Sequence, residues 1–188
     1  FSKSFAFRMK TDSEKKLTRN SGFHPRTSKL TRNFIDARGF WLPNDYTKHG
    51  VINEHTACRE KAVIIDLSSL RKFEILGPDA EELMNYTLTR NVKKLSVGQV
   101  VYSSMCYENG TMFDDGTLLK LSDHGFRWVC GDEYAGQWLK EQAAKKNYKV
   151  LIKNSTDQIN NISLQGPNSR KILEKIIFTP PTQPSISE

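Results

Sequence analysis

The feature that most constrains the fold is a strand-to-helix turn that occurs twice. Ile75-Leu76-Gly77-Pro78-Asp79 returns as Leu164-Gln165-Gly166-Pro167-Asn168, each time after a strand pattern and before an amphipathic helix pattern. Pro is favoured at the first helical position because its fixed φ suits a helix start. Two arrangements explain the repeat: two independent uses of a good turn, or one pseudo-symmetric layer of split βαβ type. Both predict an α+β protein with a largely antiparallel sheet.

Hydrophobic periodicity predicts the other elements and ferredoxin-like split βαβ units with flanking helices. Asn109-Gly110 is the strongest hairpin signal in the chain. Three aromatic residues and Pro43 within residues 39–46 predict an irregular loop. The last helix is expected to turn Ile172, Leu173, Ile176 and Ile177 toward the core. Strands are predicted at 63–66 (buried), 71–76, 99–107, 112–121, 126–130, 148–152 and 159–164, and helices at 52–61, 79–88, 132–146 and after Pro167.

Charge and composition predict three segments. Residues 1–48 hold eleven Lys and Arg against four Asp and Glu, whereas the other 140 residues hold 17 of each sign. Residues 1–32 are therefore expected to form an extended basic arm, and 33–178 the folded body. Residues 179–188 contain three prolines without periodicity and are expected to link to a further part of a longer protein. A neutral body without an aromatic-basic stripe disfavours a nucleic-acid module.

Cysteine and histidine spacing disfavours a metal site. Cys58, Cys106 and Cys130 are too widely spaced for a metal or redox pair, and no two of the four histidines stand three or four residues apart. Reduced thiols are typical of an intracellular protein. No apolar run approaches the roughly 20 residues of a membrane span, and no signal peptide is visible. We therefore expect a cytoplasmic protein, or a mitochondrial matrix protein in a eukaryote, that contacts no membrane.

Asp114 and Asp115 lie within the apolar strand predicted at 112–121. Strand alternation predicts that Asp115 shares the inward face with Phe113, Thr117, Leu119 and Leu121, while Asp114 points the other way. A carboxylate in a dry pocket is a candidate general base or partner for a ligand cation. A cap for a bulge or for turn amides explains the pattern equally simply.

Several blocks in a fixed order resemble the aminomethyltransferase (glycine cleavage T-protein) family. The most informative block runs from Tyr102 through Glu108-Asn109-Gly110 to Asp114-Asp115-Gly116. Others are Gly39-Phe40-Trp41-Leu42-Pro43, then Glu54-His55 with Arg59, then Ile65-Asp66-Leu67-Ser68, then both Gly-Pro turns. The Asp-Asp-Gly ending is most similar to the sarcosine and dimethylglycine oxidising branch. The resemblance covers the N-terminal half of the family, without its later Gly-Tyr-Thr-Gly-Glu stretch.

The resemblance implies a tetrahydrofolate-dependent one-carbon transferase that moves an aminomethyl or methyl group. It implies that Asp115 is the catalytic residue, and that Tyr102, Asp114, Leu70 and Val129 lie in the folate pocket. Residues 33–178 would be the N-terminal folate-binding part of a T-protein-like fold. The implied partners are a small amine or methyl donor and a lipoyl carrier protein or an oxidase. A non-catalytic folate-binding relative is the alternative that the resemblance leaves open.

Overall fold

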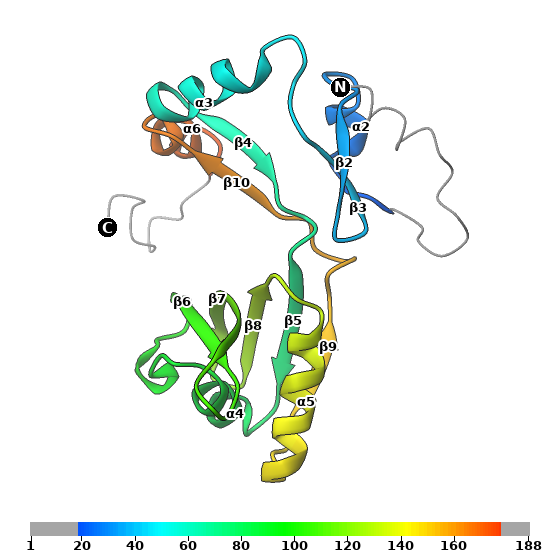
Figure 1. The fold of residues 1–188 in the computed structure, drawn as a ribbon. Coiled ribbons are helices and arrows are strands. Elements are labelled where there is room, and N and C mark those ends of the chain that lie inside the picture. Colours follow the sequence, from blue (N-terminus) through cyan, green and yellow to red (C-terminus); the bar gives the residue numbers. More distant parts are fainter. Residues whose placement is uncertain (1–18, 178–188) are drawn as a thin grey trace, which may run out of the picture. The chain divides into compact units, whose positions relative to one another are not determined.

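The computed structural model describes residues 19–177, which divide into two compact units (Figure 1). The first unit comprises residues 19–69 and 160–177, and the second comprises residues 70–159. The chain therefore leaves the first unit, builds the whole second unit and then returns. The sequence patterns had suggested one folded body over 33–178. Residues 1–18 of the expected arm and the expected linker at 179–188 lie outside the described residues.

The second unit is a five-stranded antiparallel sheet with helices on one face. The strand order is β6-β7-β8-β5-β9, and every neighbouring pair is antiparallel. Strands β8 and β9 both run antiparallel to β5, which lies between them, so β8-α5-β9 is a split βαβ unit. The α+β prediction is confirmed. The elements are β5 (Arg71–Leu76), α4 (Ala80–Thr87), the short 3₁₀ helix η1 (Val92–Lys94), β6 (Val100–Cys106), β7 (Met112–Ser122), β8 (Gly125–Cys130), α5 (Tyr134–Lys146) and β9 (Leu151–Asn154).

The core of the second unit lies between the sheet and helices α4 and α5. Every second residue of the strands enters it, and the predicted stripe of α4 is buried as expected. Burying aromatic and branched side chains stabilises the unit by about 1.5–3 kcal/mol for each side chain. The fully buried members include Ile75, Leu83, Met84, Leu118, Phe126, Trp128 and Leu139.

The first unit contains two small sheets, which are separate from the five-stranded one. Its elements are β1 (Arg19–Asn20), α2 (His24–Thr27), β2 (Phe34–Ala37), β3 (Phe40–Pro43), α3 (Gly50–Glu60), β4 (Val63–Asp66), β10 (Ile162–Gln165) and α6 (Ser169–Glu174). The order is β1-β3-β2 in one sheet, while β10 pairs with β4 in the other. Helix α2 lies within the segment that was expected to be extended.

The aromatic segment at 39–46 was predicted as an irregular loop, and this prediction is wrong. Residues Phe40–Pro43 form β3, which pairs antiparallel with β2. The turn between them consists of Arg38 and Gly39, which have positive φ values of 54° and 83°. Two such residues match the twist of a tight hairpin. The Asp36 carboxylate accepts a hydrogen bond from the Gly39 backbone N–H at 2.8 Å, which holds the turn.

Two burial predictions in the first unit are also wrong. Strand β4 was expected to be buried, but Ile64 is 62% exposed and Ile65 is 44% exposed. The isoleucines of the last helix were expected to face a core, but Ile176 is 73% exposed. An apolar sequence pattern predicts that a segment is suited to burial, but it does not determine which other segment packs against it. Within the described residues, β4 pairs with β10 alone, in a sheet of two strands.

Both Gly-Pro turns form, and they serve different sheets. Gly77 and Gly166 have φ values of 133° and 121°, a region that L side chains rarely adopt. A Cβ at Gly77 would lie 2.4 Å from the Lys149 carbonyl oxygen, and one at Gly166 would lie 2.5 Å from that of Lys61. Gly77 follows a strand of the five-stranded sheet and Gly166 follows β10. The two turns therefore do not belong to one pseudo-symmetric layer, since the two strands belong to different sheets.

Candidate functional site

Asp115 lies on the face of the five-stranded sheet opposite the helices, called here the open face. On this face Ser104 of β6 pairs with Asp115 of β7, and Tyr102 pairs with Thr117. The Tyr102 hydroxyl donates a hydrogen bond to Asp115 Oδ2. This hydrogen bond raises the pKa of Tyr102, with smaller contributions from desolvation and from the aspartate charges. The structure therefore places two residues that the sequence analysis singled out in direct contact.

The predicted inward orientation of Asp115 is wrong, and a β-bulge explains why. Met105 pairs with Asp114 but Cys106 pairs with Met112, so Phe113 is an extra residue in β7. Phe113 consequently packs on the helix side, with its ring centroid 5.6 Å from that of Trp138. Phe113 and Asp115 would share a face if the strand alternated without a break. The extra residue breaks the alternation, so Phe113 faces the helices while Asp115 faces away from them.

Asp114 occupies the buried face instead. Its side chain is 8% exposed and accepts hydrogen bonds from the backbone N–H groups of Asp115 at 2.9 Å and Asp132 at 3.0 Å. Burial raises the pKa of the neighbouring Cys130 thiol, and the negative charge of Asp114 raises it further. These bonds fix the entry to α5 against β7. The geometry gives Asp114 a structural position beneath the residue that faces outward.

The other predicted folate-pocket residues lie around the same face. Tyr102, Thr117, Val129 and Lys72 form one row across β6, β7, β8 and β5. Leu70 directly precedes β5, and its carbonyl oxygen accepts a hydrogen bond from Lys72 Nζ at 2.8 Å. The row brings a phenol, a hydroxyl and an aliphatic surface next to the Asp115 carboxylate. Such a surface suits a flat ligand with polar edges.

Sequence reasoning missed a charged pair further along the open face. Arg127 Nε lies 2.7 Å from Glu74 Oε1, and Ser155 Oγ donates to the same oxygen at 2.8 Å. Glu74 and Arg127 are opposite each other in β5 and β8. Opposite charges at matching positions of two predicted strands are a usable signal, but only after the strand pairing is known.

The first unit carries a separate cavity of about 700 Å³. Glu54 and Asp66, both from blocks of the family resemblance, lie in its wall beside Tyr46 and several isoleucines. Glu54 Oε1 accepts the Tyr46 backbone N–H at 2.5 Å, and Ser21 Oγ donates to Asp66 Oδ2 at 2.5 Å. Burial raises the pKa of the Tyr46 hydroxyl, and the charges of the two carboxylates add to that effect. Both carboxylates are therefore hydrogen-bonded to neighbouring loop segments.

Residues 19–177 contain neither a cluster of metal-ligand side chains nor a helix able to span a membrane. No group of three His, Cys, Asp or Glu side chains in that range lies close enough to hold a metal ion. None of the helices described there has the length and apolar character that crossing a membrane requires.

Comparison with known proteins places the chain in a family. The trimethylamine-oxide aldolase of Ruegeria pomeroyi is 50% identical over 188 residues, which is 100% of this chain and 24% of that protein. The aminomethyltransferase of Alkaliphilus metalliredigens is 33% identical over 148 residues, which cover 77% of this chain and 39% of that protein. The chain therefore spans about a quarter to two fifths of the length of these relatives.

A solved structure and a family profile agree with these relatives. The crystal structure of the glycine cleavage system aminomethyltransferase T from Bartonella henselae superposes with a TM-score of 0.71 and 25% identity. The match covers 84% of this chain and 43% of that one. The profile of the GCVT N-terminal domain matches residues 23–183. The chain therefore belongs to the GCVT N-terminal domain family, as its sequence blocks had suggested.

Proposed function

We propose that the open face forms part of a tetrahydrofolate site in a one-carbon transferase, with Asp115 as the acid-base residue. The observation that carries the proposal is the hydrogen bond between Tyr102 and Asp115 on the sheet face opposite the helices, where the Tyr102 side chain is exposed. Membership of the GCVT family and similarity to aminomethyltransferases support the same reaction class. A partly exposed carboxylate beside a phenol is a suitable proton acceptor for a bound amine.

The residues of the open face fit the chemistry of folate. The Tyr102 side chain, 60% exposed, offers a flat aromatic surface to a planar ring. Asp115 Oδ2 takes the phenol hydrogen, which leaves Oδ1 to accept an N–H group of a ligand. Tetrahydrofolate, when bound, supplies a nucleophilic nitrogen that accepts the one-carbon unit. Asp115 would orient that nitrogen and take up its proton as positive charge develops.

A titration with tetrahydrofolate tests this proposal on the full-length protein. We expect Asp115→Asn to bind tetrahydrofolate nearly as well as the unmodified protein, while transfer falls by about 10²–10⁴-fold because the proton acceptor is lost. Asp123→Asn removes an exposed carboxylate at the β7–β8 turn and should leave both properties unchanged. Calorimetry measures binding, and product analysis measures transfer.

Three outcomes separate the candidate functions. Absence of tetrahydrofolate binding in the unmodified protein contradicts every folate-based function. Binding without transfer in the unmodified protein, with every amine donor tried, supports a non-catalytic folate-binding relative. Normal transfer by Asp115→Asn would remove Asp115 from the reaction and leave the family assignment intact.

A second candidate function concerns the one-carbon donor. Identity to the Ruegeria pomeroyi trimethylamine-oxide aldolase is 50% over the whole chain, against 33% for the aminomethyltransferase. Loss of one methyl carbon from trimethylamine oxide as an aldehyde gives dimethylamine and formaldehyde, which balances all atoms. Formaldehyde is a one-carbon unit that amine nitrogens capture. The open face would then serve to transfer the carbon released elsewhere in a longer protein.

Product analysis distinguishes the donors. The full-length protein is incubated with trimethylamine oxide, sarcosine, dimethylglycine or glycine in separate reactions, with and without tetrahydrofolate. The aldolase function is supported if trimethylamine oxide is the only donor that yields dimethylamine, and if less free formaldehyde accumulates when tetrahydrofolate is present. One-carbon transfer from the amino acids without dimethylamine formation supports the aminomethyltransferase function instead. A lipoyl carrier or an oxidase is required as partner only in the second case.

A further inference from the structure

The open face of the five-stranded sheet extends well beyond Asp115. Asp115 lies near one end of this face, because the next residue, Gly116, pairs with Cys130, where β8 ends. In the other direction, Thr117 and Leu119 follow at alternate positions of β7, on the same side as Asp115. A ligand that contacts Asp115 and lies along the sheet therefore extends over Thr117 towards Leu119.

The middle of this surface is apolar. Leu119 lies opposite Val100 of β6, and Val100 is 54% exposed. A strand rises by about 3.4 Å per residue, so Leu119 lies about 14 Å from Asp115 along β7. Packing a flat aromatic ring against such side chains is favourable, because apolar surface on both sides leaves water. The surface therefore changes from polar to apolar with increasing distance from Asp115.

A guanidinium group lies next to the apolar part. Arg127 of β8 is opposite Leu119, and its Nε is 2.7 Å from Glu74 Oε1. Ser155 Oγ donates to that same oxygen at 2.8 Å, so the Glu74 carboxylate is held in place. The Arg127 side chain remains 27% exposed, against 14% for Glu74. Because the Glu74 contact uses Nε, the terminal N–H groups of Arg127 are left for a second partner, and a planar guanidinium can bind both oxygens of a carboxylate.

The charges at this end of the face favour an anion. Lys153 of β9 is exposed and lies opposite Glu74 of β5. The row of Arg127, Glu74 and Lys153 therefore holds two cations and one carboxylate. A partly exposed site with one excess positive charge attracts a carboxylate, although water and salt weaken the attraction.

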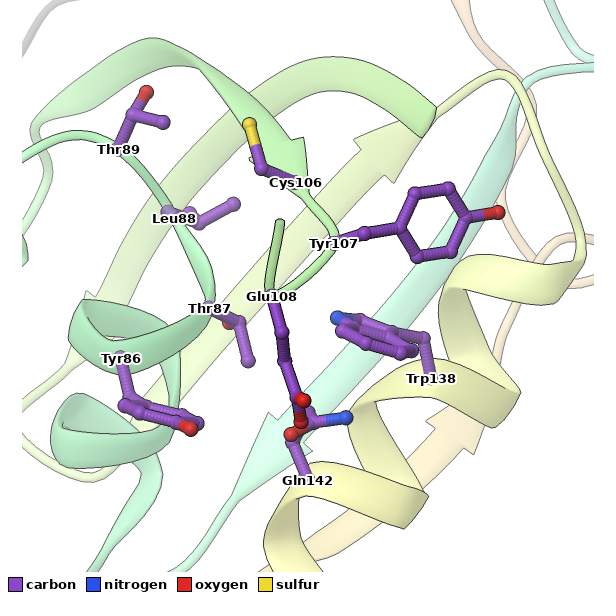
Figure 2. A pocket seen from close by; sticks show the side chains of 9 residues that line it. All are labelled: Tyr86, Thr87, Leu88, Thr89, Cys106, Tyr107, Glu108, Trp138 and Gln142. Carbon is purple, nitrogen blue, oxygen red and sulfur yellow. The ribbon is translucent and has the colours of Figure 1, made fainter. Parts of the chain in front are cut away.

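The second unit also has a hollow of about 420 Å³ at the end of β6, which suits an anion less well. Figure 2 shows it between the end of α4, the turn after β6 and one side of α5. Of the nine side chains drawn there, which include Trp138 and Gln142, Glu108 alone carries a charge, and this charge is negative. Lys145 lies 2.9 Å from Glu108 and is already paired with it. Arg127 is therefore the better partner for a ligand carboxylate.

The order of these zones matches the order of groups in tetrahydrofolate. That molecule carries a pterin ring with the reactive nitrogen, then a benzene ring, then a glutamate with two carboxylates. Bond lengths of roughly 1.3–1.5 Å separate the nitrogen from the carboxylates by about 12–15 Å in an extended molecule. This span is similar to the distance along the sheet from Asp115 to the row that contains Arg127.

We infer, on the basis of the proposed tetrahydrofolate site, that Arg127 binds a glutamate carboxylate of tetrahydrofolate. The benzene ring then lies over Leu119 and Val100, and the pterin ring lies beside Asp115. Arg127 is a specificity-determining residue in this arrangement, since it recognises the tail of the ligand and takes no part in the transfer step.

Calorimetry on the full-length protein tests the inference with tetrahydrofolate and with its dimethyl ester, in which both tail carboxylates are neutral. We expect the unmodified protein to bind the ester about tenfold more weakly, because hydrogen bonds to a charged partner are the stronger ones. Arg127→Gln keeps a donor for Glu74 and should weaken tetrahydrofolate binding about tenfold, while binding of the ester stays unchanged. Lys140→Gln removes an equal charge from an exposed position of α5 and should alter neither.

Glu74→Gln gives the opposite prediction. It removes the carboxylate that competes for the guanidinium, so tetrahydrofolate should bind severalfold more tightly, while binding of the ester stays unchanged. Thermal unfolding of each variant provides the folding control. If Arg127→Gln does not fold, the comparison of the two compounds and the Glu74→Gln variant still test the inference.

The contrary results separate this inference from the function on which it rests. Equal binding of tetrahydrofolate and its ester by the unmodified protein overturns the inference and leaves the proposed site intact. A preference for tetrahydrofolate that persists in Arg127→Gln also overturns it, because another cation then binds the tail. Absence of binding for both compounds removes the tetrahydrofolate site itself, and the inference with it.

Discussion

The two faces of the five-stranded sheet differ in what covers them, and two adjacent aspartates show the consequence. Asp114, on the helix-covered face, is 8% exposed and uses both oxygens for backbone N–H groups. Asp115, on the open face, accepts a hydrogen bond from one side-chain hydroxyl. The same residue type is thus committed to the fold on one side and available to a ligand on the other. Burial, rather than residue identity, separates the carboxylate that the fold uses from the one that stays open to other partners.

The sharpest test of this contrast uses β8. Trp128 is fully buried on the covered face, so Trp128→Ala should lower the free energy of unfolding by about 3–5 kcal/mol through lost contacts and a cavity. Val129→Ala, on the open face of the same strand, should lower it by about 1 kcal/mol or less. Urea denaturation of the full-length protein measures both. Equal losses would mean that the open face is packed in solution.

The aspartate pair gives the next largest effect. Asp114→Asn replaces one acceptor oxygen by an amide N–H₂ group, which cannot bond the backbone N–H that it faces. We expect a loss of about 1.5–3 kcal/mol, because one buried donor becomes unpaired. Asp115→Asn should change stability by less than about 0.5 kcal/mol and act on transfer instead. A stability loss that is larger for Asp115→Asn would reverse the assignment of the two faces.

Gly116 tests how closely the strands approach on the covered face. A Cβ there would lie 2.3 Å from the Val129 carbonyl oxygen and 2.9 Å from Trp128 Cζ2. Gly116→Ala should therefore cost about 1–3 kcal/mol, since neither neighbour can move freely. Thr117→Ser, one residue later on the open face, should stay within about 0.5 kcal/mol. Thermal unfolding of the two variants compares the effects directly.

The smallest expected effect is a pH dependence of the folding stability, caused by the Cys130 thiol on the covered face. Burial raises the pKa of the Cys130 thiol above its value in the unfolded chain, which is about 8.5. The folded state therefore holds this proton more tightly, so its contribution is complete below about pH 8.5 and is lost as the pH rises. Urea midpoints between pH 7.5 and 10 should fall less steeply for Cys130→Ala than for the unmodified protein. Parallel curves would show that the thiol ionises freely in the fold.

Much of the second unit could be predicted from local patterns. The stripe of α4, the Asn109-Gly110 hairpin and the alternation of Phe73 and Ile75 follow from periodicity and turn chemistry, and the structure confirms them. The first unit was predicted less well because its cues depend on partners. The positive φ of Arg38 turned an expected loop into a hairpin. The exposed isoleucines of β4 show that an apolar run does not determine whether another segment buries it.

The candidate site shows where local reasoning stops. The family resemblance pointed to Asp115 and Tyr102 as site residues, but strand alternation did not predict that their side chains are in contact. The extra residue Phe113 reversed the facing of the strand, because a bulge depends on pairing with β6 and not on the β7 sequence.

The sequence by itself determined the α+β class, the two Gly-Pro turns, the family and the nominated aspartates. These follow from backbone geometry and short-range spacing, which the chain carries in its own order. Tertiary structure alone decided that the two turns serve separate units, that Asp114 is the buried aspartate, and that Trp138 and Gln142 face a cavity. Each of these depends on which segment lies opposite another, and pairing between distant segments is fixed only when the chain has folded.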